Sequence, residues 1–251
     1  MKGKGIKMSN LNLLFNKSYF SEFNDDEFKE NNSEIINTTF SKPGRLYEEL
    51  SKYCTHHFRM KTAYPGLLVG TGYAHEAFIP GDESSEGSNN TNCVKLGFSF
   101  DYVTGMPYIP GSSVKGMLRS CFKKEGVVSE ILDKYKGPVS DLEKDIFENG
   151  KDIFFDAVIV KGNEQCLIVG KDYITPHTKG DTKEPNPLLM LKVVPDVVFE
   201  FRFRLNDYET EKGTKVSAND KAKLFMELLE IFGIGAKTNV GYGMLKKHVD
   251  R

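Results

Sequence analysis

The segment Val197-Val198-Phe199-Glu200-Phe201-Arg202-Phe203-Arg204-Leu205 decides the fold class. Apolar side chains occupy every second position from Val197 to Leu205, and Glu200, Arg202 and Arg204 lie between them. Because side chains along a β-strand alternate between two faces, this pattern puts the apolar set on one face and the charged set on the other. We therefore expect a strand over 197–205 whose apolar face lies on the core.

An amphipathic helix is predicted directly after this strand. Ser217 and Asp220 fit the spacing of a capping box, and apolar residues recur at helical spacing as far as Phe232. The glycine-rich stretch Gly233–Gly243 then ends the helix, and residues 242–249 are expected to return as a strand.

The rest of the chain mixes strand and helix patterns. We expect helices near 46–54, 127–135 and 139–148, strands near 59–69, 95–101, 153–160, 166–169 and 188–194, and loops near 24–33 and 80–93. Mixed elements of this kind predict an α+β fold, with antiparallel sheets and helices on one face.

The composition limits the classes of function. The formal net charge of the 251 residues is −1, whereas free nucleic-acid binders are often basic overall. If the protein binds nucleic acid, its positive charge must be local or partner subunits must supply the rest. The four cysteines form no C-x-x-C pair, which argues against a zinc site and a disulfide framework.

No apolar run approaches the roughly 20 residues that span a bilayer, and no signal-peptide pattern follows the basic N-terminus. We therefore expect a cytoplasmic protein without membrane contact. No spacing of residues fixes a metal site, and we expect no cofactor.

The stretch Gly233–Gly243 indicates an anion site. Four glycines flank the single Lys237, and successive backbone N–H groups in such a loop form a concave site to which a lysine adds a point charge. Helix capping or a kink in a strand would also account for some of these glycines. The loop is neither a Walker A loop nor a Rossmann fingerprint.

A second motif runs from Pro110 to Arg119. We expect Ser112 to cap a helix that places Lys115 in its first turn, where the helix dipole disfavours a cation by roughly 0.3–1 kcal/mol. A bound phosphate would reverse that sign, and Arg119 lies four residues on, on the same face. The alternative is a capped helix with two solvated cations.

Together the two segments resemble the paired signatures of the RAMP superfamily of CRISPR proteins. Further stretches, Gly70-Thr71-Gly72 with His75 and Glu76, Thr175-Pro176-His177 and Pro185-Asn186-Pro187, resemble the sixth subunit of type III-B Cmr effectors. The resemblance covers about residues 60–245.

The resemblance implies a single RAMP domain over 1–251. The N-terminal stretch of about 1–55 lies outside the resemblance and is expected to be an extension, and residues of about 80–93, which lack periodicity, are expected to form a mobile loop. The resemblance implies a ferredoxin-like (RRM-like) core and a second, degenerate ferredoxin-like half. It also implies a non-catalytic subunit that caps the backbone filament near the 3′ end of the guide RNA, with guide RNA, target RNA and other Cmr subunits as partners. The guide-RNA contacts carried over are Gly111, Ser112, Ser113, Lys115, Arg119, Gly235, Lys237, Thr238, Asn239 and Gly241.

Two other functions stay open. A metal-independent endoribonuclease of the same superfamily, processing CRISPR RNA, could use His75 or His177 as a general acid or base, although hydrogen bonding within the fold or RNA contact is the more common role. A binder of a small phosphate or nucleotide could share only the loop.

Several other polar residues have ordinary explanations. Loop 80–93 offers Asp82, Glu83 and Glu86 as carboxylates, but an acidic loop is usually only solvated. His56 and His57 are expected at the end of a helix. Arg202 and Arg204 would face solvent, RNA or a neighbour.

Overall fold

The computed structural model describes residues 10–22, 24–41, 45–70, 73–75, 92–133, 137–174, 187–209, 213 and 215–249. His177 lies outside these residues, and so does the expected loop 80–93 as far as Thr91.

The alternating segment 197–205 forms the strand β7 (Val198–Arg204), at the centre of the main sheet. Its neighbours β1 (His56–Thr62) and β4 (Ala157–Lys161) are both antiparallel to it. The sheet continues with β10 (Leu245–Lys247) beside β1 and β2 (Tyr108–Ile109) beside β4, and β3 (Ile153–Phe154) also pairs with β7.

Four strands of this sheet and two helices form its central unit. With the intervening short elements and the β5–β6 pair (within residues 169–193) left out, they follow one another as β1, α4 (Gly111–Phe122), β4, β7, α7 (Ala218–Phe232) and β10, and the strands lie in the order β10-β1-β7-β4. This is the β-α-β-β-α-β order of a ferredoxin-like unit. The expected α+β fold with antiparallel sheets is confirmed.

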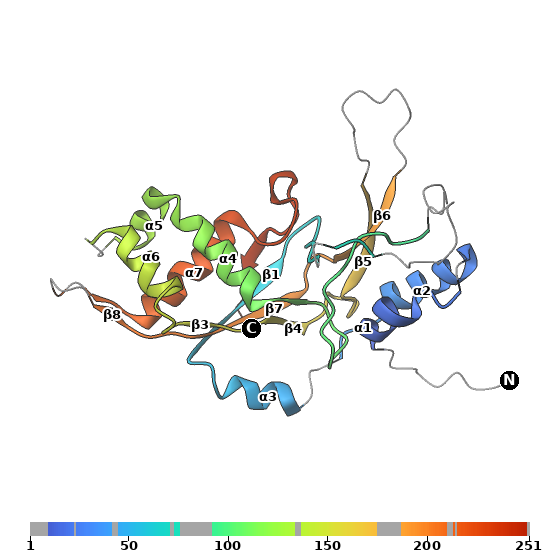
Figure 1. Cartoon of the computed structure of the whole chain (residues 1–251), viewed down its shortest axis with the longest axis horizontal. Coiled ribbons are helices and arrows are strands. Elements are labelled where there is room, and N and C mark those ends of the chain that lie inside the picture. Colours follow the sequence, from blue (N-terminus) through green and yellow to red (C-terminus); the bar gives the residue numbers. More distant parts are fainter. Residues whose placement is uncertain are drawn as a thin grey trace, which may run out of the picture.

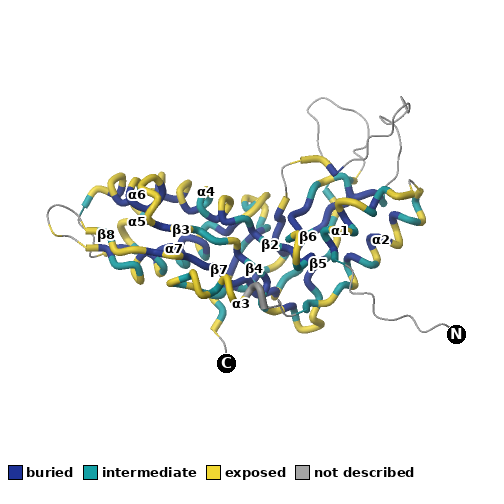
Figure 2. The backbone as a smooth tube through the Cα atoms, turned by 60° about the horizontal axis from the view of Figure 1, so that its bottom comes forward, coloured by how far each residue is buried: buried dark blue, intermediate teal, exposed yellow. Residues whose placement is uncertain are grey.

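Helices cover one face of the main sheet (Figure 1). They are α4, α5 (Glu125–Ile131), α6 (Val139–Phe147) and α7. The alternating apolar residues of β7 are all buried under them, and Phe203 lies 5.4 Å from Phe225 of α7, ring centre to ring centre. The capping box of Ser217 and Asp220 is present at the start of α7, as predicted. In Figure 2 the buried stretches of β7 and α7 lie inside, and the exposed ones face outward on α5 and α6.

The other face of the sheet carries buried charge. Glu200 of β7 accepts hydrogen bonds from Arg59 at 2.9 Å and from Arg202 at 2.8 Å. Arg202 is only 5% exposed, so the expectation that it faces solvent, RNA or a neighbour is wrong. Arg204 is exposed, as expected. A carboxylate between two guanidinium groups explains why these charges are tolerated at low exposure.

A second group of elements lies at the other end of the molecule from α5 and α6 (Figure 1). Strands β5 (Val169–Ile174) and β6 (Leu188–Val193) form a two-stranded antiparallel sheet. Helices α1 (Leu11–Leu13), η1 (Leu14–Ser18) and α2 (Asp25–Asn37) lie beside it. Within the described residues this group has no second β-α-β-β-α-β order, so a degenerate second ferredoxin-like half stays a prediction.

Three local predictions are wrong. Residues 24–33, expected as a loop, belong to α2, because the Asn24 side chain caps that helix and Phe28 and Ile35 bury its inner face. His56 and His57 begin β1 and do not end a helix; the short helix α3 (Arg45–Ser51) stops before them. The segment 95–101 forms only isolated bridges at Leu96 and Phe100.

The remaining described elements are small. Strands β8 (Tyr208–Glu209) and β9 (Lys215–Val216) form a short ribbon before α7, and η3 (Thr238–Val240) is a 3₁₀ turn within the glycine-rich stretch.

Candidate functional site

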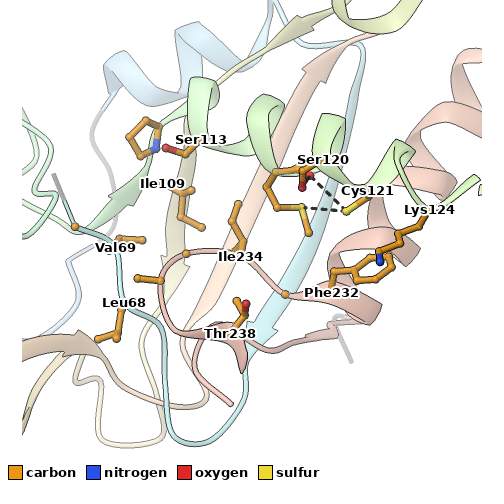
Figure 3. Close-up of a pocket in the computed structure, with 16 residues that line it drawn as sticks. Leu68, Val69, Ile109, Ser113, Ser120, Cys121, Lys124, Phe232, Ile234 and Thr238 are labelled. Carbon is orange, nitrogen blue, oxygen red and sulfur yellow. Dashed lines mark hydrogen bonds between the residues drawn. The ribbon is translucent and has the colours of Figure 1, made fainter. Parts of the chain in front are cut away.

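A cavity of about 700 Å³ lies between α4 and the glycine-rich stretch, which we call the glycine loop (residues 233–243). Three segments line it: residues 68–70 after β1, one face of α4 with residues next to its ends, and residues 232–238 (Figure 3). The two motifs singled out by the sequence are therefore neighbours in space. Of the predicted site residues, Ser113, Gly235 and Thr238 line this cavity.

One face of α4 supplies the cavity wall. Ser113, Met117, Ser120 and Cys121 line it, and Lys124 follows just beyond the helix. Their spacing of three or four residues puts them in one stripe along the helix. We call this stripe the cavity face of α4.

Lys115 and Arg119 are absent from the cavity lining. Each is two residues from a member of the cavity face, which is about 200° around the helix. The Lys115 ammonium lies 5.9 Å from the centre of the Phe154 ring. Arg119 pairs with Glu148 and, at 3.3 Å, with Glu143. These two cations therefore contact neighbouring parts of the fold.

The start of α4 differs from the expected cap. The helix begins at Gly111 with Pro110 as its N-cap residue, so Ser112 is not the cap. The Gly111 N–H donates to Asp156 Oδ1 at 2.7 Å, which supplies the negative charge that a helix start favours. A Cβ on Gly111 would lie 2.3 Å from the Phe154 carbonyl oxygen. Gly111 is thus explained by packing against β3. The Ser112 side chain is exposed.

Most glycines of the loop permit close packing. A Cβ on Gly243 would lie 1.9 Å from the Ile234 carbonyl oxygen, and one on Gly233 would lie 2.6 Å from the Gly243 carbonyl oxygen. A Cβ on Gly235 would lie 2.5 Å from the Leu68 carbonyl oxygen. All three have positive φ, which glycine adopts without strain. The glycines therefore join the end of α7 to β10 and to the segment after β1.

The tip of the loop is more open. Lys237 has a left-handed backbone with φ 58°, and Gly241 has φ 95° with only Pro65 near its added Cβ, at 3.7 Å. The side chains of Lys237 and Asn239 are exposed. Among the described residues neither has an ion pair or a side-chain hydrogen bond. Solvent and a ligand can reach both side chains.

The loop is also tied to the second group of elements. The Tyr242 hydroxyl donates to Asp172 Oδ2 at 2.8 Å, and the same oxygen accepts from Lys192 at 2.7 Å. Burial, followed by the hydrogen bond to Asp172, raises the pKa of Tyr242 to about 12. Burial would raise the pKa of Asp172, but hydrogen bonds from Lys192 and Tyr242 outweigh it and leave that pKa lowered.

The charge of the cavity is simple. Among the residues that line it, Lys124 is the one charged side chain, and neither a carboxylate nor a histidine is present. Lys124 is exposed and has no ion pair within the described parts of the chain. The remaining lining is mostly apolar, with hydroxyls from Ser113, Ser120 and Thr238. This arrangement suits an anionic ligand that also has an apolar part.

Comparison with known proteins agrees with the paired motifs. The model of the RAMP superfamily matches residues 59–246. The chain belongs to the RAMP superfamily. The match covers both α4 and the glycine loop of this RAMP protein, and it leaves out α1, η1, α2 and α3.

Two curated relatives belong to type III CRISPR systems. The chain is 33% identical over 159 residues to the CRISPR system CMR subunit Cmr6 of Saccharolobus solfataricus, over 60% of this chain and 48% of that protein. It is 27% identical over 160 residues to the CRISPR system Cms endoribonuclease Csm3 of Streptococcus thermophilus, over 57% of this chain and 70% of that protein. The chain spans about half the length of the Cmr6 relative.

A solved structure shares the RAMP fold. One chain of the type III-B Cmr-β complex bound to cognate target RNA, determined by cryo-EM, superposes with a TM-score of 0.61 at 22% identity. The match covers 88% of this chain and 71% of the other. At that identity the likeness is one of fold.

His75 is a core residue of this RAMP protein. It is 8% exposed and stacks on Phe15 at 3.7 Å between ring centres. Its Nδ1 lies 2.8 Å from the Val94 carbonyl oxygen and its Nε2 lies 2.7 Å from that of Phe15. Burial lowers the pKa of His75, while the two backbone carbonyls act in the opposite direction. Both ring nitrogens are therefore engaged within the fold.

Some important residues had no obvious signal in the sequence. Met117, Ser120 and Lys124 of the cavity could have been found by extending the helical stripe from Ser113 in steps of three and four. Lys221 of α7 is fully buried, and its ammonium lies 2.9 Å from Asp145 and 2.7 Å from Asp152. Its position on an apolar helix face was the available signal.

None of the described helices has the length and hydropathy of a membrane span.

Proposed function

We propose that this RAMP protein is a non-catalytic RNA-binding subunit of a type III-B CRISPR (Cmr) effector complex. In this role it acts in the cytoplasm and caps the backbone filament near the 3′ end of the guide RNA, with other Cmr subunits as its neighbours. One observation carries the proposal: the two segments that resemble RAMP signatures line one cavity, and the one charged residue in its described lining is a lysine.

The chemistry of this site suits an RNA backbone. Lys124 at the cavity and Lys237 at the loop tip are exposed cations with no ion pair among the described residues. Ser113, Thr238 and Asn239 add donors, and the open backbone at Gly241 lets a strand approach closely. Contacts of this kind bind phosphates whatever the base, as a guide of variable sequence requires.

Lys115 and Arg119 contribute less in this proposal than the cavity face does. Arg119 would have to exchange two carboxylates for a phosphate, and Lys115 would have to leave the Phe154 ring. The net charge of −1 fits a subunit that shares its RNA with partners. The similarity to Cmr6 and to a chain of an RNA-bound Cmr complex supports the same assignment.

A second candidate function is RNA cleavage, because one relative is named an endoribonuclease. Two observations favour the non-catalytic role. The described cavity lining contains neither a histidine nor a carboxylate, and both ring nitrogens of His75 contact backbone oxygens. Cleavage would have to use residues away from the cavity.

The binding test uses the full chain and a single-stranded RNA of guide length, titrated at several salt concentrations. We expect affinity to fall with salt, and the double variant Lys124→Ala, Lys237→Ala to reduce the salt slope by about 1.4, since each phosphate contact on a single strand contributes about 0.7. Lys223→Ala, an exposed lysine nine residues before Phe232 in the same helix, is the matched control. An unchanged slope in the double variant would contradict the site.

The catalytic test incubates the chain with CRISPR repeat RNA and, separately, with guide-paired target RNA, each with Mg²⁺ and with chelator. We expect intact RNA under all conditions. Site-specific cleavage by the purified chain would replace the proposed function with the second candidate.

A further inference from the structure

We propose that the cavity between α4 and the glycine loop holds one unstacked nucleobase of the bound RNA. The inference rests on the proposed function, because it names which part of the RNA enters the cavity. The phosphates would lie outside, at Lys124 and the loop tip, and one base would turn inward between Met117 and Ile234.

The walls of the cavity are wrong for a phosphate alone. Leu68, Ile109 and Ile234 present apolar side chains from all three lining segments (Figure 3). Met117 of α4 also lines the cavity. A phosphate gains nothing from such walls, because burying charge against apolar groups is unfavourable without compensating partners. A base has flat apolar faces and gains from being covered. The volume of about 700 Å³ lies within the range of roughly 300–1,000 Å³ typical of small-ligand sites.

An aromatic ring and a cation both line one end of the cavity. Phe232 and Lys124 both line it, and Figure 3 draws them at the same end. Phe232 is partly exposed, so a face or edge of its ring is available. Bases stack on such rings with little dependence on identity. Lys124 is then placed to bind the phosphate of the same nucleotide.

Two hydroxyls are available for the polar edge of the base. Neither Ser113 nor Thr238 has a side-chain hydrogen bond within the described residues, whereas the Ser120 hydroxyl already donates to the Met117 carbonyl at 2.6 Å. A hydroxyl both donates and accepts, so it suits any of the four bases. This tolerance matches a guide whose sequence varies.

An apolar side chain of a neighbouring subunit is the competing occupant. The lining favours the base, because its one charge is positive and its open polar groups are hydroxyls. RNA brings a negative charge next to every base, and an apolar side chain brings none.

Two variants fill the cavity from exposed positions on opposite walls, Ser113→Trp and Ala236→Trp. Either can be used if the other fails to fold. Ser129→Trp is the matched control, because Ser129 is an exposed helical serine of α5 outside the cavity.

The experiment scans a bound RNA with abasic nucleotides, which keep every phosphate and remove one base at a time. With the wild-type full chain we expect one position at which loss of the base weakens binding about tenfold, the size of a stacking contact. The same abasic site should cost less than about twofold in Ser113→Trp or Ala236→Trp, and about tenfold again in Ser129→Trp.

The outcomes separate the two proposals. If the RNA binds with a normal salt slope and no abasic position matters, the nucleobase site is wrong and the proposed function stands. If the chain and its reconstituted complex bind no RNA, both are wrong. If the tryptophan variants keep the abasic effect but fail to join the complex, the cavity takes a protein side chain and the inference is overturned.

Discussion

The two faces of α4 differ in what their polar residues already contact. On one face Arg119 is neutralised by Glu143 and Glu148, and Lys115 lies over an aromatic ring. On the cavity face Lys124 has no ion pair among the described residues. The number of cations in a motif therefore says little about RNA binding until their partners within the protein are known. If this is right, paired and unpaired residues should respond differently to substitution.

Lys221 is 0% exposed, and its ammonium forms ion pairs with both Asp145 and Asp152. Lys221→Ala leaves two carboxylates buried without their partner, which should cost about 3–5 kcal/mol of unfolding free energy. Urea denaturation measures it. The exposed neighbour Lys223→Ala should change stability by less than about 0.5 kcal/mol. An exposed ion pair contributes roughly 0–1 kcal/mol. A loss of unfolding free energy below about 1 kcal/mol in Lys221→Ala would therefore show that the ion pairs of Lys221 with Asp145 and Asp152 contribute little.

The glycines allow a similar contrast between a packed and an open position. Gly243→Ala puts a Cβ against the Ile234 carbonyl at positive φ, and it should destabilise the fold by roughly 2–3 kcal/mol. Gly116 of α4 has nothing within 4 Å of an added Cβ, so Gly116→Ala should stabilise by about 0.5–1 kcal/mol. Thermal unfolding compares them. Equal shifts in the two variants would contradict the packing role of the loop glycines.

The direct test of the two faces is RNA affinity. Lys124→Ala should weaken RNA binding about tenfold, because a hydrogen bond to a charged group contributes about 1.5–3 kcal/mol and the exposed Lys124 lies at the lower end of that range. Arg119→Ala should weaken it less than about twofold, since its charge is already paired. Fluorescence anisotropy at fixed salt measures both. If Arg119→Ala has the larger effect, RNA contacts the other face and the comparison is reversed.

The smallest effect concerns acid stability. Burial raises the pKa of Glu200, but hydrogen bonds from Arg202 and Arg59 outweigh it and hold the pKa below its ordinary value. The unfolded chain therefore takes up the proton first, and the stability that Glu200 adds is lost as the pH falls below about 4.3. Glu200→Gln should flatten the fall of unfolding free energy in that range.

Chemical denaturation at a series of pH values measures this slope. The exposed Glu130→Gln serves as the control and should leave it close to that of the wild type. A wild-type slope in Glu200→Gln would show that the two arginines do not hold the carboxylate in its charged form.

The sequence predicted what local periodicity determines. The alternation in β7 gave its core face, and Ser217 with Asp220 gave the start of α7. Helix α2 was missed because amides form part of its buried side. Asn32 is buried, and it accepts from the Tyr19 hydroxyl at 2.8 Å and donates to the Asn92 carbonyl at 2.6 Å. A pattern of apolar residues cannot reveal a core made of hydrogen-bonded amides.

The candidate site divides in the same way. The sequence singled out two distant motifs, and their members Ser113 and Thr238 line one cavity. The face of α4 that would stay available was not predictable, because Glu143, Glu148 and Asp156 come from later parts of the chain. Which cations remain unpaired is a property of the tertiary structure.

The hydrogen bonds of the glycine loop have a consequence for local unfolding. The Gly243 N–H donates to the Gly66 carbonyl, the Ala236 N–H to that of Leu68, and the Tyr242 hydroxyl to Asp172. Segments that share hydrogen bonds tend to unfold as one cooperative unit. The loop should therefore exchange the amide protons of Gly243 and Ala236 about as slowly as β1 and β10 do. The proposed RNA surface would then open only together with β1 and β10 of the main sheet.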